Sequence, residues 1–161
     1  MMTDDTAAPL AHLKGACLCG AVTVEIATDE AVLGACHCGM CRKWTSGPFI
    51  EIHTTRPIVA EGPVKTYHSS DWAERAFCGE CGSSLWYAFT AAGPHKGHAF
   101  VAAGLFEETA AMPLASEVYI ESKPAGYAFA GDRMRLTEAQ MMGAGGDGMS
   151  MGSTGPDGGK R

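Results

Sequence analysis

Seven cysteines, gathered in three short clusters, constrain the possible folds of this chain more than any other feature of its sequence. The clusters are Cys17-Leu18-Cys19, Cys36-His37-Cys38-Gly39-Met40-Cys41 and Cys78-Gly79-Glu80-Cys81. An odd number of cysteines cannot all pair within one chain, so a fully paired disulfide framework is excluded. Clustered cysteines that are not paired favour metal or redox chemistry.

The N-terminal residues indicate the compartment. They include Asp4 and Asp5 and lack the early positive charge and apolar run of a secretory signal. Nowhere do 18 apolar residues follow one another without a charge, so we expect no membrane-spanning helix and no membrane partner. We therefore expect a cytoplasmic protein whose thiols stay reduced.

Composition narrows the class of protein. The 161 residues suffice for one domain, and 46% apolar with 19% charged residues is ordinary globular usage. The formal net charge of -6 argues against nucleic acid as a partner, because phosphate binding needs a basic surface.

Short segments with strand character, separated by turn residues, predict a mainly β fold with short helical turns. Ala21–Ile26 alternates with period two, as a half-buried strand does. Further strands are expected at Phe49–Ile52, Val64–Tyr67, Ser84–Tyr87, Ala99–Val101 and Val118–Ile120. Helical segments are expected only after Cys41 and around residues 136–142.

These patterns divide the chain into three parts. Residues 1–12 are expected to be a mobile N-terminus, residues 13–136 the folded domain, and residues 137–161 a disordered tail. The tail is rich in glycine and methionine and has no aromatic residue, so it cannot bury enough apolar surface to offset its ordering entropy.

The cysteine spacing fits metal ligation. Two cysteines separated by two residues can aim both sulfurs at one ion, and a neighbouring glycine relieves the turn. The seven sulfurs divide into four, from the two outer clusters, and three, from the middle cluster, although other pairings of the clusters remain open. A four-sulfur site would be closed and structural, whereas a three-sulfur site would leave a ligand position for chemistry.

Three alternatives to this interpretation of the cysteine clusters remain open. The Cys-x-x-Cys pairs could be redox-active, but no βαβ context accompanies them. Iron could replace zinc, since four thiolates also suit iron. Both metal sites could also be purely structural.

Other residues near the clusters are weaker candidates. His37 would point away from Cys36 and Cys38 on an extended segment, so we expect it to act from behind the ligands or to satisfy the backbone. Arg42 and Lys43 could attract an anionic thiol substrate. Solvated histidines are expected at His68, His95 and His98, and core aromatics at Trp44, Trp72, Trp86 and Tyr87.

The three clusters together resemble the glutathione-dependent formaldehyde-activating enzyme family, which includes centromere-protein-V-like zinc domains. The resemblance is carried by Gly15–Gly20, Cys36–Lys43 and Phe77–Gly82, and it is supported by Gly47-Pro48-Phe49 and Ile120–Pro124. It extends from about Leu13 to Met134.

The resemblance implies a small zinc-stapled β-tent, similar to a zinc ribbon, with two Zn²⁺ per chain. It implies a structural zinc on Cys17, Cys19, Cys78 and Cys81 and an open, catalytic zinc on Cys36, Cys38 and Cys41. The family's named activity is addition of glutathione to formaldehyde, giving S-(hydroxymethyl)glutathione. For this chain we expect a carbon–sulfur lyase that adds a small thiol such as glutathione to a small aldehyde.

Two departures from the family pattern bear on the substrate. Tyr127 stands where family members often carry tryptophan, and Phe106-Glu107-Glu108 replaces the usual paired aspartates. Neither change touches a metal ligand. A non-enzymatic zinc module for protein interaction, or for metal or redox sensing, is therefore the alternative function.

Overall fold

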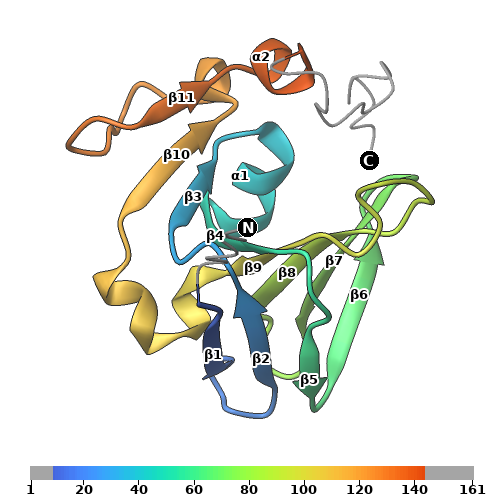
Figure 1. The fold of residues 1–161 in the computed structure, drawn as a ribbon. Coiled ribbons are helices and arrows are strands. Elements are labelled where there is room, and N and C mark those ends of the chain that lie inside the picture. The colour runs from blue at the N-terminus through green and yellow to red at the C-terminus, as the bar shows by residue number, and fades with distance from the viewer. Residues whose placement is uncertain (1–8, 144–161) are drawn as a thin grey trace, which may run out of the picture.

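The structure, a computed structural model, describes residues 9–143 as two β-sheets with short helices in the connections between strands and after the last strand (Figure 1). The smaller sheet has the order β1 (Ala11–Ala16), β2 (Thr23–Thr28) and β5 (Val59–Glu61), with antiparallel pairing. The larger sheet has the order β11 (Met134–Leu136), β10 (Leu114–Val118), β3 (Leu33–Cys36), β4 (Phe49–Thr54), β9 (Ala99–Ala102), β8 (Ser84–Phe89), β7 (Ala73–Cys78) and β6 (Val64–His68).

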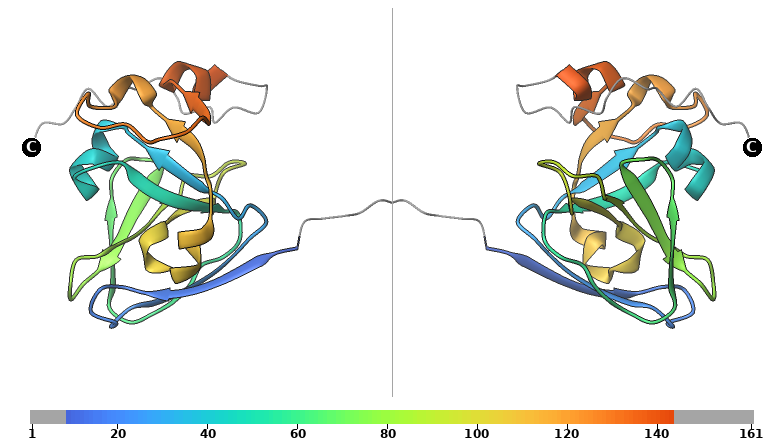
Figure 2. Two further views of the ribbon diagram at one scale, coloured as in Figure 1. Left: turned by 90° about the vertical axis from the view of Figure 1, so that its left-hand side faces the viewer. Right: turned by 90° about the vertical axis from the view of Figure 1, so that its right-hand side faces the viewer.

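Helical segments occupy the connections. The two α-helices are α1 (Gly39–Thr45), directly after β3, and α2 (Glu138–Gly143), after β11. Three 3₁₀ turns span Ala103–Leu105, Glu107–Ala111 and Ile120–Ser122. The segment from β10 to α2 lies at the opposite end of the molecule from β1 (Figure 2). No helix within residues 9–143 has the length and apolar character needed to cross a membrane.

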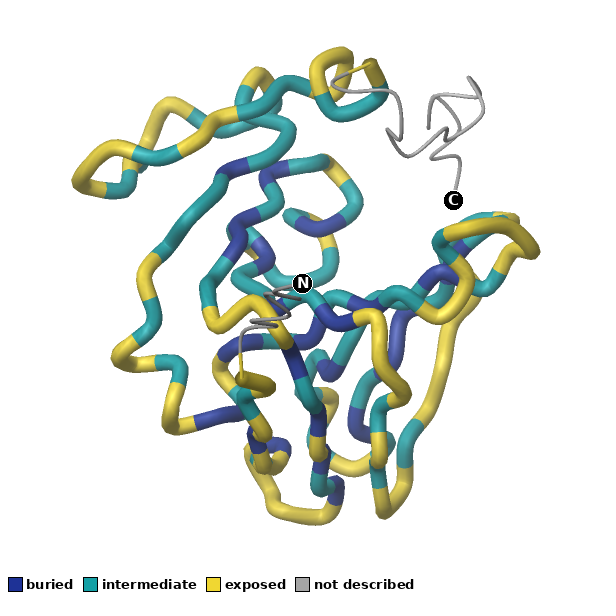
Figure 3. Tube along the Cα trace, in the orientation of Figure 1, coloured by how far each residue is buried: buried dark blue, intermediate teal, exposed yellow. Residues whose placement is uncertain are grey.

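The core lies between the two sheets. Alternate residues of β2, Val24 and Ile26, are buried, and they join Ile52, Leu85 and Val101 of the larger sheet in one apolar cluster. Exposed residues concentrate in the turns (Figure 3). Burial of this apolar face is the main force that holds the two sheets together.

The opposite face of the larger sheet is polar and aromatic. Across neighbouring strands Arg75 pairs with Tyr87, Tyr87 with Phe100, and Phe100 with His53. Residues that pair across antiparallel strands project to the same face, so these side chains form one row. This face lies on the side away from the core.

The expected mainly β fold is confirmed, and helices stand at both expected places. Some boundaries differ. The strand expected at Ala21–Ile26 begins at Thr23. The one expected at Val118–Ile120 ends at Val118, because Tyr119 adopts the left-handed conformation with φ 56° and a 3₁₀ turn follows.

The limits of the folded region also differ from the expected ones. β1 begins at Ala11, inside the stretch expected to be a mobile N-terminus, and α2 lies within the stretch expected to be a tail. Residues 1–8 and 144–161, which hold the rest of those two stretches, lie outside the described residues.

Two expectations about side chains were wrong in part. His68 is exposed, but His95 and His98 are half-buried and make an edge-on ring contact with each other, and His98 also contacts the ring of His53. Trp86 packs against the core as expected, whereas Trp44 and Tyr87 flank the guanidinium of Arg75. Tyr87 lies on the face of the larger sheet away from the core, and Trp44 belongs to α1. His95 and His98 lie in the connection between β8 and β9, outside the core.

Candidate metal centres

The structure brings the seven cysteines into two groups, with four sulfurs in one and three in the other. The first holds Cys17, Cys19, Cys78 and Cys81, and the second holds Cys36, Cys38 and Cys41; within each group the sulfurs lie within 4.8 Å of one another. All seven are free thiols. We call these groups the four-cysteine site and the three-cysteine site.

The four-cysteine site joins two loops that are distant in sequence. Cys17 and Cys19 lie in the turn after β1, and Cys78 and Cys81 lie at the end of β7 and in the turn that follows. In each turn a glycine, Gly20 or Gly82, adopts positive φ, which an L side chain rarely does. The turn hydrogen bonds Gly20 N–H to Cys17 O (3.0 Å) and Gly82 N–H to Cys78 O (2.9 Å) hold the sulfurs together.

The sulfur spacing of this site fits a tetrahedral ion. The Sγ atoms of Cys17 and Cys19 lie 3.6 Å apart, and those of Cys19 and Cys78 lie 3.9 Å apart. Four thiolates at a zinc–sulfur distance of ~2.3 Å would be separated by about 3.8 Å. A disulfide needs about 2.05 Å, so the sulfurs lie at metal-ligand separations rather than at bonding distance.

Backbone groups complete the four-cysteine site. The N–H of Val22 donates to Cys17 Sγ at 3.2 Å, and the N–H of Cys81 donates to Cys78 Sγ at 3.5 Å. Ser83 Oγ accepts a hydrogen bond from the N–H of Leu18 and so ties the two loops together. No Lys, Arg or His side chain within residues 9–143 hydrogen-bonds to these four sulfurs.

The three-cysteine site is built at the junction of β3 and α1. Cys36 ends β3, Cys38 is the N-cap of α1, and Cys41 is buried in its first turn. The Sγ of Cys38 accepts from the N–H of Cys41 at 3.4 Å, so one sulfur of this group also caps the helix. No fourth His, Cys, Asp or Glu within residues 9–143 joins this group.

The three thiols perturb one another strongly. Their hydrogen bonding raises the pKa of Cys36 and lowers the pKa of Cys38, with the Cys36–Cys38 contact as the main cause for both. Three sulfurs this close cannot all ionise without a cation among or beside them. The donor set therefore suits a soft divalent ion such as zinc.

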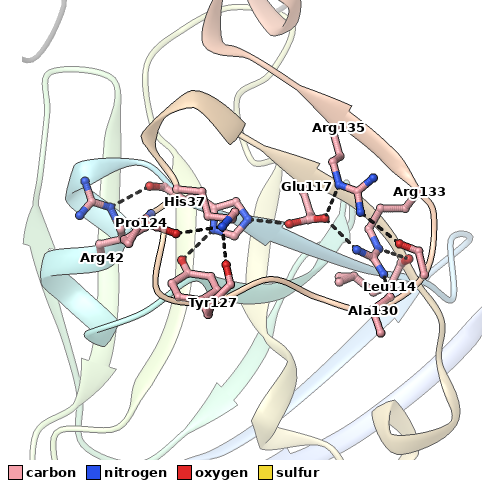
Figure 4. A network of polar contacts seen from close by, with 11 residues as sticks. His37, Arg42, Leu114, Glu117, Pro124, Tyr127, Ala130, Arg133 and Arg135 are labelled. Carbon is pink, nitrogen blue, oxygen red and sulfur yellow. Dashed lines mark hydrogen bonds and ion pairs between the residues drawn. The ribbon is translucent and has the colours of Figure 1, made fainter.

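His37 lies outside both cysteine groups, as its position between two ligands predicts. It is fully buried; its Nε2 lies 2.9 Å from Glu117 Oε1, and its Nδ1 lies 2.9 Å from the Tyr127 hydroxyl (Figure 4). Its backbone oxygen accepts from Arg42 Nε at 3.0 Å. His37 thus anchors the Cys36–Cys38 segment from behind.

Glu117 is the centre of this buried network. Its Oε2 accepts from Arg133 Nη1 at 2.8 Å and from Arg135 Nε at 3.0 Å (Figure 4). Burial would raise the pKa of Glu117, but hydrogen bonds from Arg133, His37 and Arg135 outweigh burial and lower it. No sequence pattern near Glu117 pointed to this role.

The two basic residues after the middle cluster line a shallow cavity of about 270 Å³ beside α1. Arg42 and Lys43 contribute the charge, and Ser46, Pro124 and Tyr127 form part of the wall. Gly39, adjacent in sequence to Cys38, lies at its edge, but no cysteine lines it. The cavity therefore flanks the three-cysteine site rather than enclosing it.

Sequence reasoning missed Arg75, which contacts the three-cysteine site from β7. Its side chain is buried, and its Nη1 and Nη2 each lie 3.7 Å from Cys41 Sγ. The available signal was an arginine in a short strand that, apart from Glu74, has only small and apolar residues, Ala73-Glu74-Arg75-Ala76-Phe77-Cys78.

Comparison with known proteins supports the resemblance. A family model described as glutathione-dependent formaldehyde-activating enzyme matches residues 12–122. A protein of Schizosaccharomyces pombe described as an uncharacterized lyase is 37% identical over 131 residues, covering 80% of this chain and 93% of its own. A crystal structure of a Rhodobacter sphaeroides protein is 20% identical and covers 64% of this chain and 100% of its own, with a TM-score of 0.49.

The family match extends from β1 to the end of the last 3₁₀ turn and includes both cysteine groups. It covers more than half of the chain and agrees with the clusters that carried the resemblance. The chain belongs to the glutathione-dependent formaldehyde-activating enzyme family.

Proposed function

We propose that this protein is a zinc-dependent carbon–sulfur lyase that adds a small thiol, such as glutathione, to formaldehyde. The observation that carries the proposal is the three-cysteine site, which offers three protein sulfurs for an ion that takes four ligands. Family membership and the lyase name of the Schizosaccharomyces pombe relative support the reaction class.

We assign two zinc ions per chain. The four-cysteine site would hold a structural zinc, since its four sulfurs complete a tetrahedron. The three-cysteine site would hold the second zinc, which, when bound, stabilises the thiolate form of a substrate thiol near neutral pH.

The reaction balances without an added oxidant or reductant. The thiol sulfur adds to the carbonyl carbon, and a carbon–sulfur bond forms. The carbonyl π electrons move to oxygen, and the proton lost by the thiol ends on that oxygen. The product is a hydroxymethyl thioether, and the protein has only to favour the thiolate and hold the two reactants together.

The basic cavity beside α1 fits the remote part of such a thiol. Glutathione carries two carboxylates, and Arg42 and Lys43 place two positive charges on one wall. Arg42 is fixed by its hydrogen bond to the His37 oxygen, which connects the cavity to the Cys36–Cys38 segment. These residues would bind and orient the thiol while its sulfur reaches the three-cysteine site.

Adduct formation from ¹³C-formaldehyde, followed by NMR above the uncatalysed rate, tests the proposal. We expect turnover with glutathione by the zinc-loaded protein and its loss in Cys38→Ser. Turnover equal to the uncatalysed rate would favour the alternative, a non-enzymatic zinc module for protein interaction or for metal or redox sensing.

Charge removal at the cavity tests the assignment of Arg42 and Lys43. We expect the double variant Arg42→Ala, Lys43→Ala to raise KM for glutathione roughly tenfold or more, because charged hydrogen bonds contribute about 1.5–3 kcal/mol each. For the uncharged thiol 2-mercaptoethanol, KM should stay the same. An equal rise for both thiols would contradict a carboxylate-binding role.

A further inference from the structure

The guanidinium of Arg75 has an unusual environment for a buried charge. Arg75 as a whole is only 6% exposed, and its guanidinium lies against two aromatic rings, with its Cζ 4.8 Å from the ring centre of Trp44 and 4.9 Å from that of Tyr87. Both terminal nitrogens face Cys41 Sγ at 3.7 Å. The two rings hold the plane of the guanidinium in place, and the sulfur lies opposite the two terminal nitrogens.

Arg75 has no carboxylate partner in the part of the chain that the structure describes, where ion pairs involve Lys14, His37, Arg133 and Arg135 instead. A buried charge is costly unless an opposite charge or strong hydrogen bonds compensate it. The aromatic rings supply part of that compensation. The group in contact with Arg75 is Cys41 of the three-cysteine site, whose thiols become thiolates when they bind a metal.

The contact between Arg75 and Cys41 affects the net charge of the metal-loaded three-cysteine site. Three thiolates around a divalent ion leave one net negative charge, and a thiolate as fourth ligand would leave two. The permanent positive charge of Arg75 offsets one of them. Among residues 9–143, the hydrogen-bond partners that the four-cysteine site has outside its own sulfurs are backbone and hydroxyl groups, which suits a closed structural site that takes no further anion.

We propose that Arg75 is the charge-compensating residue of the three-cysteine site, where its guanidinium strengthens metal binding and permits an anionic thiol as fourth ligand. Arg75 is a positioning residue, since it acts through Cys41. The metal-binding part rests on zinc occupancy of that site, and the thiol-binding part rests on the proposed function.

The test measures metal affinity at each site separately. Wild type, Arg75→Met and Arg75→Lys are loaded with zinc and titrated with a chromogenic chelator, with the exposed Arg56→Met as the matched control. We expect Arg75→Met to weaken the more easily removed zinc roughly 10- to 100-fold, the usual effect of losing a group that supports a metal ligand. Arg75→Lys, which keeps the charge but loses the fork, should give a smaller loss.

The tightly held zinc serves as an internal control for folding, because it should be retained equally in all four proteins. Unchanged affinity for the second zinc in Arg75→Met would overturn the proposal, and so would equal weakening at both sites. If Arg75→Met does not fold, the titration of Arg75→Lys tests the proposal instead. Zinc affinity equal to that of wild type in Arg75→Lys would then overturn the proposal.

A second readout separates this inference from the proposed function. In cobalt-substituted protein, glutathione should perturb the sulfur-to-cobalt charge-transfer bands of wild type at lower concentration than those of Arg75→Met. A wild type that does not respond to glutathione would overturn the thiol-binding part and count against the proposed function. The chelator titration would still decide the role of Arg75 toward the metal.

Discussion

At the scale of single residues, Glu51 on β4 is the most perturbed carboxylic acid away from the cysteines. Its Oε2 is buried without a hydrogen-bond partner among the described residues, and its Oε1 occupies the space where a side chain on Gly34 would lie. Burial, helped by the charge of Glu30, raises the pKa of Glu51 to about 8. The carboxyl is therefore protonated in the folded protein at neutral pH.

This protonation predicts a pH-dependent stability. Between about pH 4.5 and about pH 8 the unfolded chain releases the Glu51 proton while the folded protein keeps it, so stability falls as pH rises through that window. Glu51→Gln removes the ionisable group and should flatten the slope. At pH 9 we expect the variant to be more stable by on the order of 2–4 kcal/mol, since each pKa unit is worth about 1.4 kcal/mol.

Urea unfolding at pH 5, 7 and 9 measures this effect. Glu30→Gln provides the matched control, because the charge of Glu30 is the lesser cause of the shift and its loss should flatten the slope only slightly. Equal stability of Glu51→Gln and wild type at pH 9 would show that the carboxyl ionises at its ordinary pKa.

At the scale of elements, the buried hydrogen bonds and ion pairs around Glu117 connect β10 and β11 to the three-cysteine site. One carboxylate joins His37, between two cysteines of the three-cysteine site, to Arg133 and to Arg135 of β11. β11 has only three residues and pairs only with β10, so its own ladder contributes little. The network therefore contributes much of what holds this end of the sheet in place.

Breaking the Glu117 network should lower the free energy of unfolding more than breaking a surface ion pair does. Glu117→Ala leaves His37 and Arg133, which are buried, without their partner, and we expect a loss of roughly 3–5 kcal/mol in the free energy of unfolding. Glu25→Ala removes the exposed pair with Lys14 and serves as the control, with little expected change in melting temperature. Equal effects of the two variants would mean that the buried pairs are not coupled to folding.

At the scale of the whole molecule, the two cysteine groups hold different parts of the structure. The four-cysteine site joins the turn after β1 to the end of β7, and its Cys19 and Cys78 are 59 positions apart. The three-cysteine site uses six consecutive residues, Cys36–Cys41, and connects only β3 to α1. We expect loss of the first site to free the turn after β1 from the end of β7, whereas loss of the second leaves that connection intact.

Paired serine variants test this division. Cys78→Ser should lower thermal stability strongly, because structural zinc contributes on the order of 10 kcal/mol. Cys38→Ser should remain folded but inactive. Thermal unfolding and zinc content of both proteins measure the difference, and an equal loss of stability would count against separate roles.

Chelator treatment of the wild type tests the separate roles of the two cysteine sites without any substitution. We expect one zinc to be removed readily while the fold, followed by circular dichroism, persists, and the second to be removed only with unfolding. Removal of both ions together would indicate one coupled metal centre.

Some strands of this fold could be predicted from the sequence, and others could not. The period-two alternation of β2 and the apolar run of β8 were recognisable, because their alternate or consecutive residues face a core. β3 (Leu-Gly-Ala-Cys) and β11 (Met-Arg-Leu) were not predicted, because such short segments carry no periodicity and form only by pairing with neighbours.

The sequence by itself determined which atoms could bind metal, since cysteine spacing within a turn is a local property of the chain. It also determined the mainly β character, through local alternation. The spacing also suggested a division of seven sulfurs into four and three but left other pairings open. Only the tertiary structure decided it, because Cys17 and Cys78 meet only when the sheets have formed. The same holds for Arg75, Glu51 and Glu117, whose charges acquire their partners and their burial from strands distant in sequence.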